Sequence, residues 1–234
     1  MFINVEGVPE LSDFRNLSPS MQRFWDKASE SLRKNGESAA DVYPQAGLFA
    51  EFGKVACITA GVLRRREGYT QPFFVTTTFV SDDEREVLAN FSEVVNNLFA
   101  DNNKPHYLCG HGIWQRDMPF VAKRLLVNHM PLPSIFDNKA RCPLRAQLVD
   151  TAESWTFSDH SAPRVPADLL AEVFGLDCED SDYDVTVAND IFYTDGDIDA
   201  LKARSERKAL LNAQLVLRFR GEGVIDPGHV VRKA

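Results

Sequence analysis

Alternation of hydrophobic and polar residues predicts strands in the first part of the chain. Phe2–Glu6 alternates in this way and predicts a first strand almost at the start of the sequence. Two longer segments rich in β-branched and aromatic residues, Val55–Leu63 and Phe73–Val80, are separated by a polar turn that contains Gly68. We expect these two segments to form a β-hairpin.

Helices are predicted where apolar residues recur every three or four positions. Ser81 precedes an acidic first turn and an apolar face that ends near Leu98, which predicts a helix over that stretch. Further helices are predicted at about Pro19–Lys34, Arg116–Leu126, Thr151–Trp155, Pro166–Phe174 and Asp197–Arg218. Short apolar segments at His106–Cys109 and Ala146–Val149 predict a fourth and a fifth strand.

This order of elements predicts an α/β fold class. Strands that first cluster and then alternate with helices predict a mixed five-stranded sheet flanked by helices on both faces. No internal repeat and no long linker divides the 234 residues. We therefore expect a single domain over residues 1–222 and a C-terminal tail over residues 223–234.

Composition is typical of a globular protein, with 44% hydrophobic and 26% charged residues. The longest stretch without a charged residue is Gly68–Ser81, 14 residues, whereas a membrane-spanning helix needs about 20 apolar residues. The first 20 residues carry Glu6, Glu10 and Asp13 and no apolar segment typical of a secretory signal. We expect no membrane partner and a cytoplasmic location.

The net charge of −8 is distributed unevenly along the chain. Residues 177–199 hold nine acidic and no basic residues, so the remainder has a net charge of +1. Overall charge therefore does not exclude a nucleic-acid partner. The cysteines Cys57, Cys109, Cys142 and Cys178 lie far apart, which favours free buried thiols over a zinc site.

Two groups of polar residues point to chemistry at the predicted sheet. Asn4 and Glu6 lie two positions apart on the first strand, so both side chains project from the same face. Asp117 begins a helix shortly after a buried strand, and ligand sites favour the carboxyl ends of such strands. Each signal is weak alone, because polar residues at strand ends and acids at helix starts also have purely structural roles.

Together with further segments, these residues resemble a known family. The segments are Phe2–Glu6, Leu48–Val55, Gly110–Phe120, Asp150–Trp155 and the last helix up to Glu222. In their order and spacing they resemble the DNA polymerase B-like predicted 3′–5′ exonuclease family, which belongs to the DEDD exonuclease superfamily with the ribonuclease H-like fold. The resemblance covers about residues 1–222.

Such nucleases are implied to use four carboxylates that hold two divalent metal ions for phosphodiester hydrolysis. The family positions correspond here to Asn4, Glu6, Asp117 and, on the last helix, Arg204 and Lys208. Only Glu6 and Asp117 retain an acid: Asn4 and Lys208 replace aspartates, and Arg204 replaces a tyrosine. Arg116 replaces an aromatic residue and Gly112 an asparagine.

These substitutions change the charge of the implied metal site. Glu6 and Asp117 supply two negative charges and Lys208 one positive charge, too little to hold two Mg²⁺ ions. We predict that the Lys208 ammonium occupies the vacated metal position, within salt-bridge reach of Glu6 or Asp117. No metal is expected, and Mg²⁺ or Mn²⁺ would act only if Glu6 and Asp117 had recruited Asp150 or Asp199 as replacement ligands.

Weaker candidates lie outside these family positions. Arg64, Arg65 and Arg66 at the hairpin tip could bind nucleic-acid phosphates, although exposed basic turns are often simply solvated. His111 could face the cleft, although a structural role is the commoner one for such a histidine. Asp150 could be a ligand, but capping of the helix at Thr151 also explains it.

Two apparent motifs are rejected from the sequence. Tyr193 and Asp197 match a Tyr-x-x-x-Asp pattern, but Gly196 interrupts a helix there and Asp197 is suited to cap the final helix. Asp180, Asp182 and Asp184 resemble the opening of a calcium loop, but the required glycine and the final glutamate are absent.

The sequence leaves three functions open. The first is an exonuclease homologue that has lost hydrolysis and retains binding of single-stranded nucleic acid. The second is an active metal-dependent 3′–5′ exonuclease with rearranged ligands. The third is a non-catalytic protein-interaction module.

Overall fold

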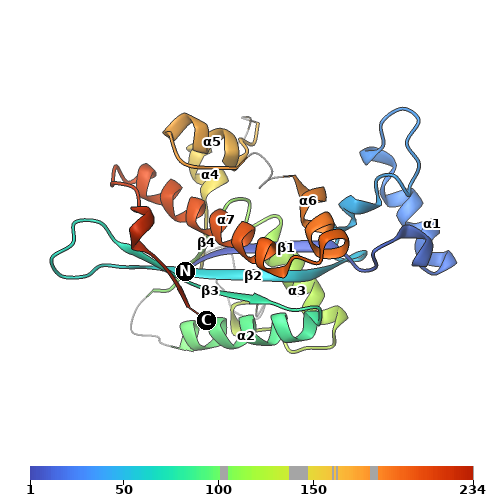
Figure 1. The fold of residues 1–234 in the computed structure, drawn as a ribbon, viewed down its shortest axis with the longest axis horizontal. Helices are drawn as coiled ribbons and strands as arrows, with labels where there is room; N and C mark the ends of the chain where they lie inside the picture. Colours follow the sequence, from blue (N-terminus) through green and yellow to red (C-terminus); the bar gives the residue numbers. More distant parts are fainter. Residues whose placement is uncertain (101–104, 137–146, 160, 162, 180–183, 234) are drawn as a thin grey trace.

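A mixed sheet forms the centre of the computed structural model, which describes residues 1–100, 105–136, 147–159, 161, 163–179 and 184–233. Six strands of this described part pair in the order β5-β4-β1-β2-β3-β6 (Figure 1). They are β1 (Phe2–Pro9), β2 (Gly53–Arg64), β3 (Phe73–Val80), β4 (Leu108–Gly110), β5 (Leu148–Asp150) and β6 (Val230–Lys233). The pairs β1–β2 and β2–β3 are antiparallel, whereas β1–β4, β4–β5 and β3–β6 are parallel.

The predicted count of five strands is corrected by β6, which lies in the predicted C-terminal tail. Val230–Lys233 pairs with β3 in parallel, with Phe74 opposite Val230. The segment has only two apolar residues, so its own sequence carries little strand signal. Backbone pairing with the otherwise open edge of β3 makes it a strand.

Helices cover both faces of the sheet, as predicted. The described α-helices are α1 (Pro19–Ala28), α2 (Glu84–Ala100), α3 (Asp117–Val127), α4 (Thr151–Thr156), α5 (Ala167–Phe174), α6 (Val185–Asn189) and α7 (Ile198–Phe219), with a π-helical segment at Asp190–Asp195. Figure 1 shows α2 on one side of the sheet and the long helix α7 on the other. Helix α1 is shorter than predicted and ends at Ala28. The chain then turns back, and Trp25 donates a hydrogen bond to the Ala39 carbonyl at 2.8 Å.

The alternation along β1 divides the core into two layers. Ile3 packs with Ile58 against α2 and α3. Phe2 faces the other way and packs with Phe74 and with Ala209 and Ala213 of α7. Side chains at positions 4 and 6 share the face of Phe2, so β1 directs them toward α7.

None of the described helices combines the length and the apolar character needed to cross a membrane.

Candidate functional site

Strand β1 holds Asn4 and Glu6 beneath helix α7. Both side chains are buried, although neither is apolar. Asn4 donates from Nδ2 to Oε1 of Glu6 at 2.8 Å and to the Ser205 hydroxyl at 3.1 Å. The pairing of β1 with β2 shifts register between Glu6 and Gly7, directly after the acid. The two residues therefore form one hydrogen-bonded unit.

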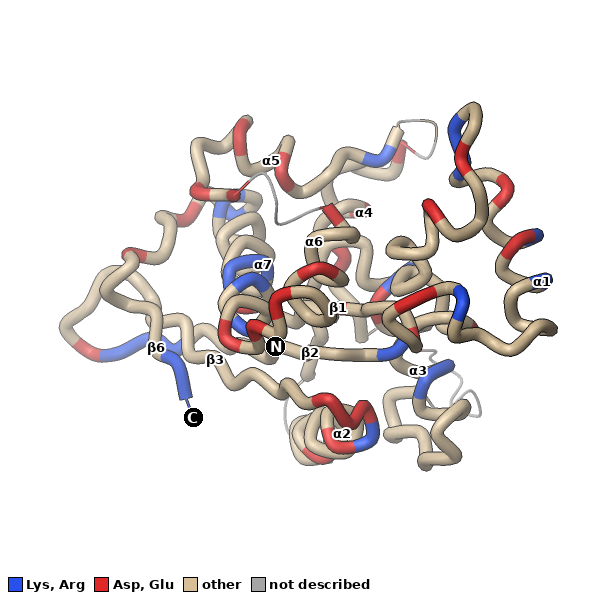
Figure 2. The backbone as a smooth tube through the Cα atoms, turned by 45° about the vertical axis from the view of Figure 1, so that its right-hand side comes forward, with Lys and Arg blue, Asp and Glu red and all other residues tan. Residues whose placement is uncertain are grey.

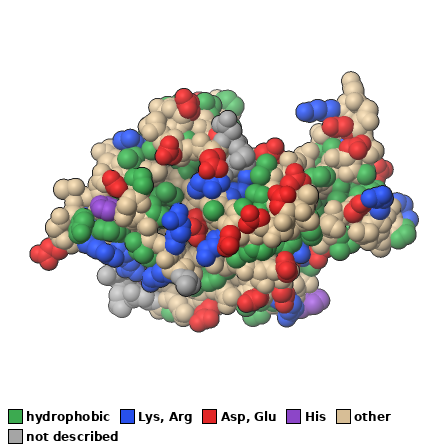
Figure 3. Space-filling model, viewed as in Figure 1, with side chains coloured by type: hydrophobic (Ala, Val, Ile, Leu, Met, Phe, Trp, Pro, Cys, Tyr) green, Lys and Arg blue, Asp and Glu red, His purple; other side chains and the backbone are tan. Residues whose placement is uncertain are grey.

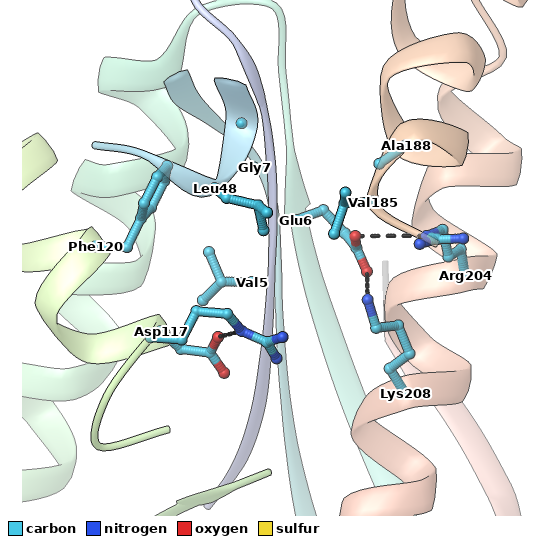
Figure 4. A pocket seen from close by; sticks show the side chains of 12 residues that line it. Val5, Glu6, Gly7, Leu48, Asp117, Phe120, Val185, Ala188, Arg204 and Lys208 are labelled. Atoms are coloured by element: carbon cyan, nitrogen blue, oxygen red, sulfur yellow. Dashed lines mark hydrogen bonds and ion pairs between the residues drawn. The ribbon is translucent and has the colours of Figure 1, made fainter. Parts of the chain in front are cut away.

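Helix α7 directs two cations at Glu6 (Figure 4). Arg204 and Lys208 lie four residues apart, which places them on the same face of the helix. Lys208 Nζ lies 2.9 Å from Glu6 Oε1, and Arg204 Nε lies 3.4 Å from Glu6 Oε2. The predicted salt bridge of Lys208 is confirmed, and its partner is Glu6.

Charge and burial compete at this cluster. Burial alone would raise the pKa of Glu6, but Lys208 and Arg204, with hydrogen bonds from Lys208 and Asn4, lower its pKa below the ordinary value of 4.5. Burial lowers the pKa of Lys208, and the attraction of Glu6 acts against that shift. Glu6 is therefore held as a carboxylate whose charge is balanced inside the protein.

Asp117 lies at the first turn of α3, on the other side of the site from Lys208 (Figure 4). It is buried, and it accepts a hydrogen bond from Arg116 Nε at 3.0 Å. Arg116 also donates to the His111 carbonyl at 3.4 Å. The second acid of the site thus has a cation of its own, supplied by its neighbour in sequence.

A small cavity brings these groups together. It has a volume of about 50 Å³ and is lined by Glu6, Asp117, Arg116, Arg204 and Lys208 among its walls. Three cations and two anions give this lining a net charge of +1. Within the described part of the chain, no group of three or more His, Cys, Asp or Glu side chains is arranged to hold a metal ion.

The residues present do not fit the pair of divalent ions that the family resemblance implies. Mg²⁺ binds anionic oxygen ligands in octahedral geometry and releases water reluctantly. Here both oxygens of Glu6 face cations, at 2.9 Å and 3.4 Å. The chemistry of the donor set therefore opposes a two-metal centre.

A row of polar side chains extends from the site across the sheet. Asn4, Thr59 and Thr78 lie opposite one another on β1, β2 and β3. Hydrogen bonds or an ion pair join each residue of the row to the next. The row consists of Glu6, Asn4, Ser205, Thr59, Thr78, Glu206 and Arg232. The row ends where Arg232 Nε meets Glu206 Oε2 at 2.6 Å, on β6. Buried polar groups beneath α7 are thus connected from the site to the edge of the sheet.

His111 and Asp150 have structural partners outside the cavity. The ring nitrogens of His111 lie 3.0 Å from the Thr151 hydroxyl and 2.9 Å from the Val165 carbonyl. Burial lowers the pKa of His111. Asp150 caps α4, as predicted, by accepting from Ala152 N at 2.9 Å, and it also accepts from the backbone of Gly112 and Trp114.

The interpretation of the segment before α7 is confirmed. Gly196 has a φ of 63° and ends the π-helical segment that contains Tyr193. Asp197 caps α7 by accepting from Ala200 N at 2.9 Å. Asp199 is exposed in the first turn of α7. Asp184 caps α6, whereas Asp180 and Asp182 lie outside the described residues.

The three hairpin arginines lie away from the cavity. Arg64 ends β2 and is seven residues from Cys57, the partner of Glu6 in the sheet, which corresponds to about 23 Å along an extended strand. Arg65 pairs with Glu222 at 2.5 Å, and Arg66 lies over the ring of Phe73 at 4.2 Å. The length of β2 therefore separates the hairpin arginines from the acids of the site.

Of the three cysteines that the structure describes, Cys57 and Cys109 are free, buried thiols. Burial raises the pKa of each of these two to about 12. The third is Cys178, and Cys142 lies outside the described residues. The prediction of free, buried thiols is confirmed for Cys57 and Cys109.

Sequence reasoning missed two residues of the site. Arg116 appeared only as a replacement for an aromatic residue, although its place next to Asp117 was a signal for an ion pair. Ser205 joins Asn4 to Thr59, and its position next to Arg204 on the same helix was the available signal. No protein-family model, curated protein or solved structure matches this chain.

Proposed function

We propose that this protein is a catalytically inactive homologue of the DEDD 3′–5′ exonucleases, with a ribonuclease H-like fold, and that it binds single-stranded nucleic acid without hydrolysing it. The observation that carries the proposal is the ion pair between Lys208 and Glu6 at 2.9 Å. This ion pair supports the loss of hydrolysis, because the resemblance implies a metal ion beside the same carboxylate.

The arrangement of the family positions supports the proposal. Glu6, Asp117, Arg204 and Lys208 come from β1, α3 and α7, which are far apart in sequence, and all four line one cavity. Antiparallel pairing of β1, β2 and β3, followed by parallel β4 and β5, agrees with the mixed sheet that the resemblance implies. Fold alone does not establish activity, so the proposal depends on the charges of the site.

An active enzyme with rearranged ligands is less well supported. Asp150 already accepts three backbone N–H groups, and Asp199 is exposed on the first turn of α7. Neither lines the cavity that contains Glu6 and Asp117. For either carboxylate to reach the cavity, the first turn of its helix, α4 for Asp150 or α7 for Asp199, would have to move.

The decisive experiment incubates fluorescently labelled single-stranded DNA and RNA with the protein in Mg²⁺ and in Mn²⁺. We expect no shortening of either strand on a denaturing gel, and binding that weakens as salt rises. Metal-dependent digestion that disappears in Glu6→Gln would refute the loss of hydrolysis. Absence of binding at low salt would refute the binding function and favour the protein-interaction module.

A further inference from the structure

A second concentration of positive charge lies at the end of the sheet where the β2–β3 hairpin meets β6. Residues 64–73 and 220–233 contain six basic and three acidic residues, a net charge of +3 in a chain whose total is −8. The six basic residues are all exposed: Arg64, Arg65, Arg66, Arg220, Arg232 and Lys233. Figures 2 and 3 show basic residues gathered at this end of the molecule, over the hairpin and β6.

Pairing of β6 with β3 creates this surface from two distant parts of the sequence. Arg232 lies opposite Thr76, and Lys233 lies opposite Thr77, on the strand that follows the hairpin. Arg65 is neutralised by Glu222 and Arg232 by Glu206. Arg64, Arg66 and Lys233 form no ion pair with an acid in the described ranges, and their charges remain available to an anionic ligand.

An exposed aromatic ring stands among these cations. Tyr69 is 56% exposed, and its ring meets Phe73 edge-on at 5.0 Å and His229 edge-on at 5.4 Å. Phe73 and His229 stack on each other at 4.2 Å, and the Arg66 guanidinium lies 4.2 Å from the centre of the Phe73 ring. These contacts fix the orientation of Tyr69 while most of its ring faces solvent.

We infer that this hairpin surface, formed by Arg64, Arg66, Tyr69 and Lys233, binds single-stranded nucleic acid. The cations contact phosphates, and Tyr69 stacks on an unpaired base, which is the combination that proteins use to bind single strands. A duplex offers the same phosphates but keeps its bases stacked inside. The inference rests on the proposed function for its class of partner. Within this surface, Arg64 lies about 23 Å along β2 from the residue opposite Glu6.

The test is fluorescence anisotropy of a labelled oligothymidine with the full chain in EDTA, which prevents hydrolysis. In Arg64→Gln/Arg66→Gln we expect the slope of log affinity against log salt to fall by about 1.4, or about 0.7 for each lost phosphate contact. In Tyr69→Ala we expect affinity to fall about tenfold at constant salt slope. The control Arg23→Gln/Lys27→Gln removes the same charge from α1 and should bind like the wild type.

Two results would overturn the inference. The first is an affinity and a salt slope of the hairpin variants equal to those of the wild type and of the α1 control. The second is equal binding of duplex and single strand, or tighter binding to phosphatidylserine vesicles than to oligothymidine. Circular dichroism melting checks that each variant is folded. Digestion by the wild type in Mn²⁺ would instead refute the proposed loss of hydrolysis and leave the hairpin result standing.

Discussion

The ammonium group of Lys208 and the carboxylate of Glu6 form an ion pair at 2.9 Å, with both side chains at most 10% exposed. Such a pair must compensate the cost of removing two charges from water. Arg204 and Asn4 add contacts to the same carboxylate, at 3.4 Å and 2.8 Å. Glu6 is thus supported by three neighbours, and the following predictions measure what each charge contributes.

Substitution Lys208→Met removes the cation and retains much of the apolar stem. We expect the free energy of unfolding to fall by about 3 kcal/mol, because Glu6 then remains buried with a single cation, Arg204. Urea denaturation measures the loss. Lys202→Met, on the same helix but without a contact to Glu6, is the matched control and should change stability by less than about 0.5 kcal/mol.

The double variant Glu6→Gln/Lys208→Met completes a thermodynamic cycle. Removal of both charges should restore part of the stability lost in Lys208→Met, since position 6 then carries no buried charge, while Arg204 loses its contact with the Glu6 carboxylate. A double variant as unstable as the sum of the two single variants would show that the pair is not coupled.

Acid pH should weaken the fold through Glu6. The pKa of Glu6 is lowered in the folded state, so its contribution to stability is complete above the unfolded value of 4.5. It is lost as the pH falls from that value through the lower folded pKa. Urea denaturation above and below pH 4.5 should therefore show a smaller acid-induced loss in Glu6→Gln than in the wild type. Equal losses in the two proteins would contradict this prediction.

Two added carboxylates at the site should create a binding site for a divalent ion. Asn4→Asp/Lys208→Asp removes the ammonium and places two additional carboxylates beside Glu6, which favours a divalent ion. We expect Mn²⁺ binding by isothermal titration calorimetry in this variant and none in the wild type. A triple variant that also carries Arg204→Gln should bind more tightly. Absence of a heat of binding in both variants would show that carboxylates at positions 4 and 208 are not sufficient for a metal site.

The wall of the cavity depends on a close approach between two glycines. A Cβ atom added at Gly47 would lie 2.6 Å from the Gly7 carbonyl oxygen and 2.8 Å from Val8 Cα, both backbone atoms that cannot rotate away. We expect Gly47→Ala to lower the free energy of unfolding by about 2 to 3 kcal/mol. Gly223→Ala is the control, because the nearest atom, Gln71 Nε2, is 4.0 Å away.

Local patterns predicted most of the fold, and contacts between distant segments account for the rest. The alternation of Phe2–Glu6 and the cap at Asp197 are local signals, and both elements formed as expected. Strand β6 has no such signal, because Val230–Lys233 becomes a strand only through its pairing with β3. This pairing requires the free edge of β3, which is distant in sequence, so residues 230–233 and their neighbours alone do not predict the strand.

The site shows the same division between spacing and partner choice. The spacing of Arg204 and Lys208 predicted that both reach one place, because residues four apart share a helix face. Whether Lys208 meets Glu6 or Asp117 depends on how α7 lies across the sheet, which spacing does not determine. In the structure Lys208 pairs with Glu6, and Asp117 pairs with Arg116.

The distance in sequence between Glu6 and its counter-charges has a consequence for synthesis. Glu6 and Arg204 are 198 residues apart, so about 10 to 40 s of translation separate their appearance. During that interval β1 can pair with β2, while its acid remains hydrated on an uncovered face. Because α7 carries both Arg204 and Lys208, the docking of one helix buries Glu6 and neutralises it in a single event.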